Sequence, residues 1–288
     1  MNLNRQSLQT LFPNGTFKST YNTNQTDLII PTDNGFFYLP IKDLTSREES
    51  LITELLIKNQ QSNGSNNSIW FDYLFNGKDM STSTHQYRII QLKIRKDSTD
   101  KKTWLEHFSK LFDCVIEAFF VDDTSAYLVE QQTAIINSTD DIKAMLLTLE
   151  TEFLIKSIVY VGQFRLLSDK FVTCFYEEQN IFNQFYSSFH PNDVFSFQDV
   201  ALTYLTKKAI KESSLMTHFY QSTVFDDEII QIIKTLWSEQ GNITSTAKKL
   251  YIHRNTLQYK LDKFSEQSGI SLKNMTDLTL CYLLILSF

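Results

Sequence analysis

The side chains with the clearest chemical use lie in one short segment, residues 241–263. Amide, hydroxyl and basic groups recur there at helical spacing, and such groups hydrogen bond to base edges and phosphates. We expect base reading by four of them, Asn255, Thr256, Gln258 and Tyr259. We expect phosphate contacts from eight others, Thr244, Ser245, Thr246, Lys248, His253, Arg254, Lys260 and Lys263. His253 precedes the expected helix, so capping that helix is an equal alternative for it.

Two short helices joined by a tight turn would position these groups. Thr244 or Ser245 can cap the first helix, whose inward residues are Ala247 and Leu250. Ile252 is apolar enough to fill the turn that follows.

The second helix is expected from about His253 to Phe264. At about 100° per residue, Leu257, Leu261 and Phe264 share one stripe, and Asn255 and Tyr259 point the opposite way. An apolar stripe behind a polar outer face is typical of a recognition helix in a major groove. The segment therefore predicts a helix-turn-helix, with a solvated helical hairpin as the alternative.

Charge favours this interpretation locally. The whole chain has a formal net charge of −6 and a pI near 5.4, so it is not a general binder of polyanions. Within 241–263, five lysines and arginines accompany one carboxylate, Asp262, which leaves a net +4. Positive charge is thus concentrated where a phosphate backbone would lie.

The segment from Thr246 to Leu261 resembles the C-terminal DNA-binding domain of the PucR/CdaR family of bacterial transcription regulators. The family pattern T-A-x-x-L-x-I-H-R-N-T-L-x-Y-[RK]-L is met from Thr246 to Leu261, with Asn242 as the Asn-rich entry. The match covers roughly Phe225 to the C-terminus, and the middle of the chain more loosely. The hairpin is also similar to the DNA-binding end of the Fis protein. The resemblance implies a promoter or operator in double-stranded DNA as partner and leaves the small-molecule effector unidentified.

Flanking segments supply a small helical core for this domain. Residues 226–237 place isoleucines and a leucine at helical spacing, and Gly241-Asn242 ends that helix. The apolar run Leu278–Phe288 is expected to form a helix that closes the domain. It is too short to span a bilayer, because a membrane-spanning helix needs about 20 residues. A purely intradomain core role and a contribution to a dimer are equal alternatives for it.

Composition excludes several other classes. The first residues lack a basic stretch followed by a long apolar one, so we expect no signal peptide and a cytoplasmic location. The three cysteines, Cys114, Cys174 and Cys281, are far apart and predict buried, reduced thiols rather than a metal or redox site. We expect no catalytic residue, no metal and no cofactor.

The first part of the chain predicts a small α/β segment. A helix near Ser7–Phe12 precedes strands at Thr26–Pro31 and Gly35–Ile41, joined by a turn at Asp33-Asn34-Gly35. A helix over Arg47–Lys58 follows, and then the polar stretch Asn59–Ser68, which we interpret as a linker.

Residues 86–186 alternate between strand and helix patterns. Strands are expected at Tyr87–Ile94, Val115–Val121, Ala126–Glu130 and Lys156–Gly162, and helices at Thr103–Phe112, Thr139–Leu154 and Ser168–Tyr186. The order βαββαβ predicts a sheet with helices covering one face. It resembles the GGDEF-like central domain of the same family, a relative of the diguanylate cyclase fold.

That likeness raises the hypothesis of an enzyme. A cyclase needs a glycine-rich hairpin for substrate phosphates, but the corresponding hairpin, residues 121–127, contains no glycine. Asp122 and Asp123 at its tip are expected to form the turn rather than to bind a metal. We therefore expect a degenerate, non-catalytic domain.

Taken together, the pattern predicts an α+β multidomain chain in four parts. They are an N-terminal segment with its linker, 1–68, a GGDEF-like domain, 69–190, a helical connector, 191–224, and a PucR-type helix-turn-helix domain, 225–288. The connector has Ser196 as its expected cap, and it serves either in signalling and dimer contact or in packing alone.

We expect an effector-responsive, sequence-specific regulator acting as a homodimer, because one recognition helix covers too few base pairs to specify an operator. A dimer contact is expected from the Leu278–Phe288 helix or the aromatic faces of the central domain. A cyclase-like enzyme and a non-DNA-binding interaction protein are the alternatives.

Overall fold

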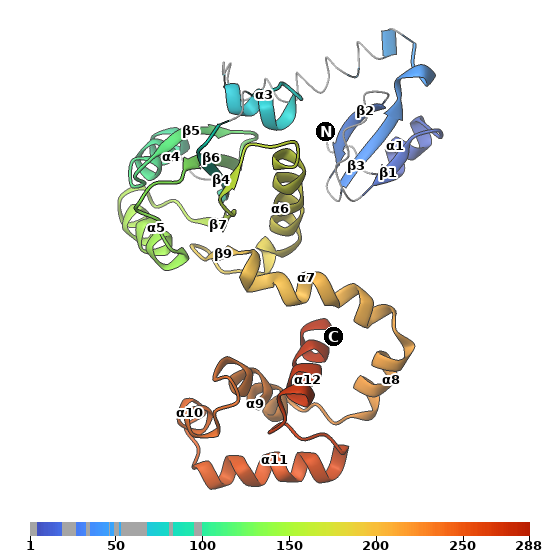
Figure 1. The fold of residues 1–288 in the computed structure, drawn as a ribbon, viewed down its shortest axis with the longest axis vertical. Helices are drawn as coiled ribbons and strands as arrows, with labels where there is room; N and C mark the ends of the chain where they lie inside the picture. The colour runs from blue at the N-terminus through green and yellow to red at the C-terminus, as the bar shows by residue number, and fades with distance from the viewer. Residues whose placement is uncertain are drawn as a thin grey trace. The chain divides into compact units, whose positions relative to one another are not determined.

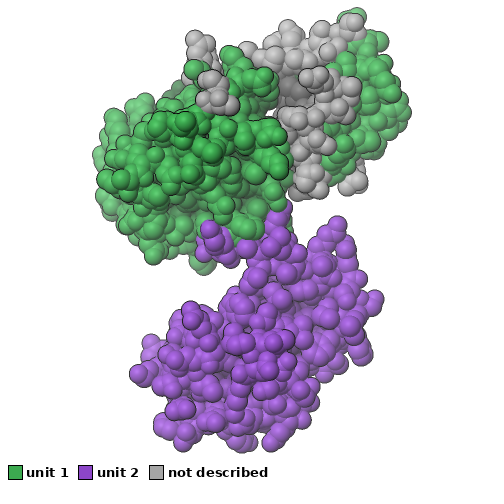
Figure 2. Space-filling view, in the orientation of Figure 1, with its two compact units in different colours: residues 1–197 green, residues 198–288 purple. Residues whose placement is uncertain are grey.

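The computed structural model of this chain divides into two compact units, residues 1–197 and 198–288, which Figure 2 shows in different colours. It describes residues 5–18, 27–32, 35–45, 47–48, 52, 68–80, 83–94 and 100–288. Three predictions lie wholly or largely outside these residues: the turn at Asp33-Asn34, the helix over 47–58 and the linker at 59–68. The architecture is α+β multidomain, with sheets in the first unit and only helices after Phe197, as predicted.

A three-stranded antiparallel sheet follows the first helix, α1 (Arg5–Leu11). Its strands have the order β1-β3-β2 and span Thr16–Lys18 (β1), Asp27–Thr32 (β2) and Gly35–Pro40 (β3). The two predicted strands are confirmed, and β1 was not predicted. A short 3-10 helix, η1 (Ile41–Asp43), comes next. Leu8, Ile30, Phe37 and Leu39 form the buried core of this segment.

A six-stranded sheet forms the centre of the first unit (Figure 1). Its strands are β4 (Gln86–Ile94), β5 (Val115–Phe120), β6 (Ser125–Gln131), β7 (Ser157–Val161), β8 (Arg165–Leu166) and β9 (Val194–Ser196). The order is β5-β6-β4-β7-β9, with β8 paired to β4, and every pairing is antiparallel except β7 with β9. The four predicted strands are confirmed, and β8 and β9 are additions. β5 is the terminal strand on one side.

Helices cover both faces of this sheet, so the prediction of one covered face is wrong. The helices are α3 (Ile69–Phe75), α4 (Lys101–Ser109), α5 (Thr139–Phe153) and α6 (Phe171–Phe185), with the 3-10 turn η2 (Tyr186–Ser188). In β4, Ile90, Leu92 and Ile94 pack with α4 and α5, and Tyr87 and Ile89 pack with α3 and α6. Figure 1 shows α4 and α5 on the side opposite α6.

The aromatic stripe of α6 lies inside this packing. Phe171, Phe175, Phe182 and Phe185 are all buried. Burial of large aromatic side chains stabilises the unit and removes them from its surface. These four side chains are therefore unavailable for a dimer contact, whereas a contact through other parts of the central domain stays a prediction.

The second unit is all helical. Its helices are α7 (Phe197–Glu212), α8 (Ser214–Ser222), α9 (Asp227–Ser238), α10 (Ile243–Lys249), α11 (Arg254–Ser268) and α12 (Met275–Ser287). One apolar cluster joins α9, α10, α11 and α12, and Leu278, Cys281 and Leu284 are the α12 residues at its centre. The intradomain role of the last helix is therefore confirmed, whereas a dimer role for it stays a prediction.

The three cysteines are all free thiols, and Cys281 is the one that lies in this helical core. Its side chain is fully buried, and burial raises the pKa of the thiol to about 12, so it stays protonated at neutral pH. Cys114 and Cys174 are half-buried and, like Cys281, form no disulfide. No helix among the described residues is both long and apolar enough to cross a membrane.

Candidate nucleic-acid interface

The first helix of the motif, α10, begins at a residue other than the two expected. Asn242 is its N-cap, and its side-chain oxygen accepts from the backbone N–H of Thr244 at 3.0 Å and of Ser245 at 3.1 Å. Asparagine directly before a helix satisfies N–H groups that have no intrahelical partner. Thr244 and Ser245 therefore lie in the first turn of α10 and do not cap it.

The turn between α10 and α11 closes α10 with two backbone hydrogen bonds. Ile252 N–H donates to the carbonyl of Ala247 at 3.0 Å, and Tyr251 N–H donates to that of Lys248 at 3.1 Å. These are the two bonds of a Schellman motif, which requires a left-handed residue after the C-cap. Tyr251 adopts that conformation, with φ 56°, and its side chain is 96% exposed. Ile252 packs against the core as predicted.

The second helix, α11, is anchored by the predicted stripe. Leu257, Leu261 and Phe264 are each at most 4% exposed. The helix extends one turn beyond the expected end at Phe264, because Gly269, with φ 73°, provides the left-handed C-terminal residue. Figure 1 shows α11 as a long helix with one side free within its unit.

The outward side of α11 carries the four expected base-reading residues. Asn255, Thr256, Gln258 and Tyr259 are all exposed, and the Tyr259 side chain is 67% exposed. They occupy the first two turns, where recognition helices place base contacts. The helix can thus present two amides, a hydroxyl and a phenol to one groove while its stripe stays buried.

Five of the eight expected phosphate contacts divide into three groups. Lys248, Arg254 and Lys263 are exposed, and none of them forms an ion pair within the described residues. Lys260 is only half-exposed and pairs with Glu228 of α9 at 2.8 Å. Thr246 is fully buried, and its hydroxyl donates to the carbonyl of Asn242 at 2.7 Å. A buried hydroxyl cannot reach phosphate, so the prediction for Thr246 is wrong.

Ion pairs also reduce the local positive charge that the sequence predicts. Lys249 pairs with Glu239 at 3.0 Å, and Asp262 pairs with Lys273 at 2.5 Å. Exposed pairs of this kind contribute little to stability, but in each pair the carboxylate offsets the positive charge of its lysine. Lys248, Arg254 and Lys263 are left as the cations most available to a phosphate backbone.

His253 is the N-cap of α11. Its Nδ1 accepts from the backbone N–H of Asn255 at 3.2 Å, and the side chain is exposed. Because Nδ1 accepts, the neutral ring carries its proton on Nε2. The structural alternative for this residue is therefore confirmed, and its Nε2–H remains a donor for an anion.

The acidic hairpin between β5 and β6 provides no evident metal site. Asp122 Oδ1 accepts from Thr124 N–H at 2.7 Å, Thr124 Oγ1 at 2.9 Å and Ser125 N–H at 2.8 Å. Burial acts to raise the pKa of this carboxyl, but these hydrogen bonds and the charge of Lys93 lower it overall. Asp122 is thus a turn former, as predicted. Among the described residues, no group of three or more His, Cys, Asp or Glu side chains could hold a metal.

The two helices, their tight turn and the exposed first turns of α11 define a helix-turn-helix motif. Residues 230–286 match the family model of the PucR C-terminal helix-turn-helix domain. The second unit of the chain therefore carries a PucR-type helix-turn-helix domain.

Relatives of the chain fit this assignment. A leucine-rich protein of Streptococcus dysgalactiae subsp. equisimilis is 33% identical over 167 residues, which cover 57% of this chain and 58% of that protein. The carbohydrate diacid regulator of Escherichia coli (strain K12) is 50% identical over 38 residues, which cover 13% of this chain and 10% of that protein. The chain thus matches less than two thirds of the length of either relative.

A solved structure, of a regulator of polyketide synthase expression from Bifidobacterium adolescentis, is 13% identical and has a TM-score of 0.30. That match covers 71% of this chain and 86% of that one. A likeness of this size is too weak to establish a shared fold.

Proposed function

We propose that this transcriptional regulator binds promoter DNA through α11, which enters the major groove of the duplex. The observation that carries the proposal is the division of α11 into two faces. Asn255, Thr256, Gln258 and Tyr259 are exposed, while Leu257, Leu261 and Phe264 are buried. Asparagine and glutamine can each make two hydrogen bonds to adenine, so this face is suited to sequence readout.

Phosphate contacts would surround that face. Lys248, Arg254 and Lys263 supply positive charge, and Thr244, Ser245 and the Nε2–H of His253 supply neutral donors. Lys260 contributes less while Glu228 holds it, since a competing carboxylate lies within 2.8 Å. Binding would therefore weaken as salt is raised.

The remaining parts of the chain would supply regulation. We propose the four-part division given above, with residues 69–190 as a degenerate GGDEF-like domain that senses a small-molecule effector. The order β4-α4-β5-β6-α5-β7 supports that likeness, and the absence of glycine from residues 121–127 supports a non-catalytic role. The protein would act as a cytoplasmic homodimer, because two recognition helices specify an operator where one does not.

A gel shift with the protein's own promoter region tests the proposal. Retarded promoter DNA that resists competition by unrelated DNA is expected, with no nucleotide turnover by the same preparation. Equal affinity for every DNA contradicts sequence-specific binding. Absence of DNA binding supports the interaction-protein alternative, and turnover of a nucleotide supports the enzyme alternative.

A further inference from the structure

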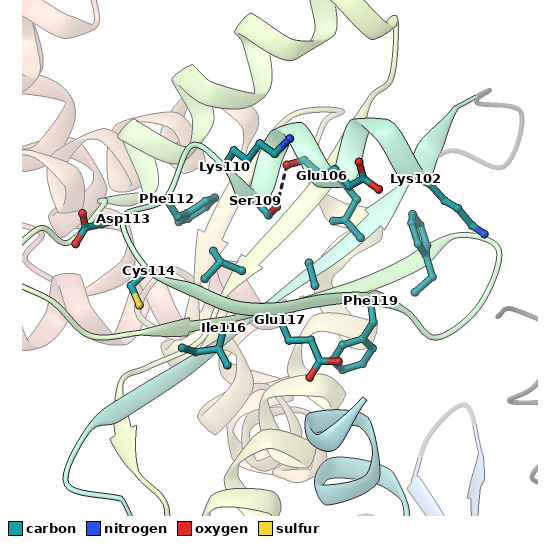
Figure 3. Close-up of a pocket in the computed structure, with 14 residues that line it drawn as sticks. Lys102, Glu106, Ser109, Lys110, Phe112, Asp113, Cys114, Ile116, Glu117 and Phe119 are labelled. Carbon is teal, nitrogen blue, oxygen red and sulfur yellow. Dashed lines mark hydrogen bonds between the residues drawn. The ribbon is translucent and has the colours of Figure 1, made fainter. Parts of the chain in front are cut away.

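Charged side chains of both signs lie close together in each unit. In the first unit, a groove of about 670 Å³ lies between α4 and β5, and Figure 3 shows Lys102, Glu106, Lys110 and Asp113 along it. Both signs are mixed there, so the groove selects no single class of ligand. In the second unit, by contrast, opposite charges of α9 and α11 contact each other directly beside the expected DNA interface.

The first turn of α9 places a carboxylate next to α11. Asp226 is the N-cap of α9, and its Oδ1 accepts from the backbone N–H of Ile229 at 2.8 Å. Glu228 follows in the first turn, where the positive end of the helix dipole favours a carboxylate. Because Ile229 is buried in the helical core, the backbone that carries Glu228 is held in place.

Glu228 reaches from this turn to Lys260 of α11. Its Oε2 lies 2.8 Å from the Lys260 Nζ. The Lys260 side chain is 27% exposed, whereas that of Glu228 is 62% exposed. The lysine is therefore drawn toward α9, while the carboxylate that holds it remains open to solvent.

Lys260 borders the exposed face of α11. Residues three and four apart are neighbours on a helix surface, so Lys260 lies beside Thr256 in the turn before and Lys263 in the turn after. Thr256 is an expected base reader, Lys263 is an expected phosphate contact, and both are exposed. A phosphate backbone alongside this face would therefore pass within reach of Lys260 and meet the carboxylate of Glu228 at the same place.

A phosphate at this place would compete with Glu228 for one ammonium group. The Lys260 ammonium has three N–H donors, and one of them is directed at Glu228. A phosphate that accepts from another donor would lie close to the carboxylate, and like charges repel more strongly where an interface excludes water. A paired lysine also has little net charge to displace counterions from DNA. Lys260 can therefore contribute fully to DNA binding only after Glu228 has released it.

A second ion pair of the motif provides a matched comparison. Lys249 pairs with Glu239 at 3.0 Å, and Glu239 is the C-cap of α9, at the end opposite Glu228. Lys249 belongs to α10 rather than to α11, and we expect no phosphate contact from it. Removing the charge of Glu239 therefore changes net charge as much as removing that of Glu228, without freeing an expected phosphate contact.

We propose that Glu228 competes with DNA phosphate for Lys260 and so limits the affinity of α11 for any duplex. The proposal rests on the proposed function, since it needs α11 to bind DNA. It adds an intramolecular contact that restrains the interface. The restraint acts equally on all sequences, because phosphates carry no base information.

A double-mutant cycle on the full-length chain tests this competition. Glu228→Gln should raise affinity for promoter and unrelated DNA alike, roughly three- to tenfold at low salt, because Lys260 gains a phosphate contact. The slope of log affinity against log salt should become steeper by roughly one unit. Lys260→Ala should flatten that slope by roughly one unit in the Glu228→Gln background, and by much less where Glu228 is present. Glu239→Gln should leave the slope close to that of the wild type.

Several results would overturn the proposal. Equal flattening by Lys260→Ala in both backgrounds would show that Lys260 binds phosphate whether or not Glu228 is present. No flattening in either background would remove Lys260 from the contact surface. Equal gains from Glu239→Gln and Glu228→Gln would reduce the effect to a loss of negative charge anywhere on the motif.

Two controls separate these results from other failures. Exposed ion pairs contribute little to stability, so every variant should fold, and circular dichroism with thermal unfolding checks each one. A wild-type chain that binds no DNA at low salt contradicts the proposed function, and this proposal with it. Where the wild type does bind DNA, the outcomes of the cycle bear on the competition alone.

Discussion

His253 accepts the backbone N–H of Asn255 through Nδ1, so one imidazole both starts α11 and directs a second donor outward. The capped residue is itself an expected base reader. Under the proposed function, helix formation and DNA contact would be coupled at the first residues of α11, and substitution can separate the capping role of His253 from its proposed role in DNA contact.

Replacing His253 with alanine should remove both the cap and the Nε2–H donor. The loss of an N-cap costs about 0.5–2 kcal/mol, and amide exchange at Asn255 should become faster. His253→Asn supplies a capping oxygen but no imidazole donor, so it should keep slow exchange while lowering affinity for all DNA sequences. Wild-type affinity in His253→Asn would restrict this histidine to its structural role.

Asn255 and Gln258 should read bases. Alanine at either position is expected to cost on the order of 1–3 kcal/mol of binding free energy at one or two base positions, and to leave folding unchanged. Binding to a library of single-base operator variants measures the effect. Gln267→Ala, an exposed glutamine on the same helix beyond the expected contacts, is the matched control. Uniform weakening on every sequence would show that Asn255 and Gln258 do not read bases.

Lys248 and Lys263 should contact phosphates, whereas Lys249 should not. Lys248→Ala or Lys263→Ala is expected to reduce the slope of log affinity against log salt by roughly one unit each. Lys249 pairs with Glu239, so Lys249→Ala on the same motif should change the slope much less. Titrations at several salt concentrations give the slopes. If all three slopes match the wild type, none of these lysines lies on the contact surface.

Much of this interface could be predicted from the sequence because it depends on local periodicity. The stripe Leu257, Leu261 and Phe264 follows from helical spacing alone, and the exposed face follows from the stripe. The cap was misassigned because three consecutive or near-consecutive residues of capping type, Asn242, Thr244 and Ser245, compete for the position. Gly269, not the last apolar residue, marks the end of α11.

Features that depend on tertiary contacts could not be predicted from the sequence. The pairing of Lys260 with Glu228 joins residues on two helices, and no local pattern reveals it. The prediction of one covered face came from the element order βαββαβ, which does not show whether a strand is apolar on one face or on both. Ile89 and Ile90 are neighbours in β4, so their side chains point to opposite faces of the sheet. Both are buried, which is typical of a strand with helices on both sides.

Tyr251 should carry a conformational cost that glycine would relieve. Its φ of 56° places a residue with a Cβ in the left-handed region, at a cost of roughly 1–2 kcal/mol. Tyr251→Gly should stabilise residues 198–288, with a midpoint of thermal unfolding raised by about 4–8 °C per kcal/mol for a unit of this size. Hydrogen exchange during thermal unfolding follows that unit separately. An unchanged or lower midpoint would show that the exposed ring makes a compensating contribution.

Asp122 should give the β5–β6 hairpin a stability that depends on pH. Its folded pKa is lowered, so its contribution is fully present above the unfolded value of about 3.9 and is lost as pH falls through the folded pKa. Asp122→Ala should lower the thermal midpoint of residues 1–197 at neutral pH, and the difference from the wild type should shrink in acid. Asp122→Asn keeps an acceptor for the turn without titrating there, so its stability should lack this acid-dependent loss. Thermal unfolding between neutral pH and pH of about 3 tests all three proteins, and a wild-type curve parallel to that of Asp122→Ala would contradict the role of the ionised carboxylate.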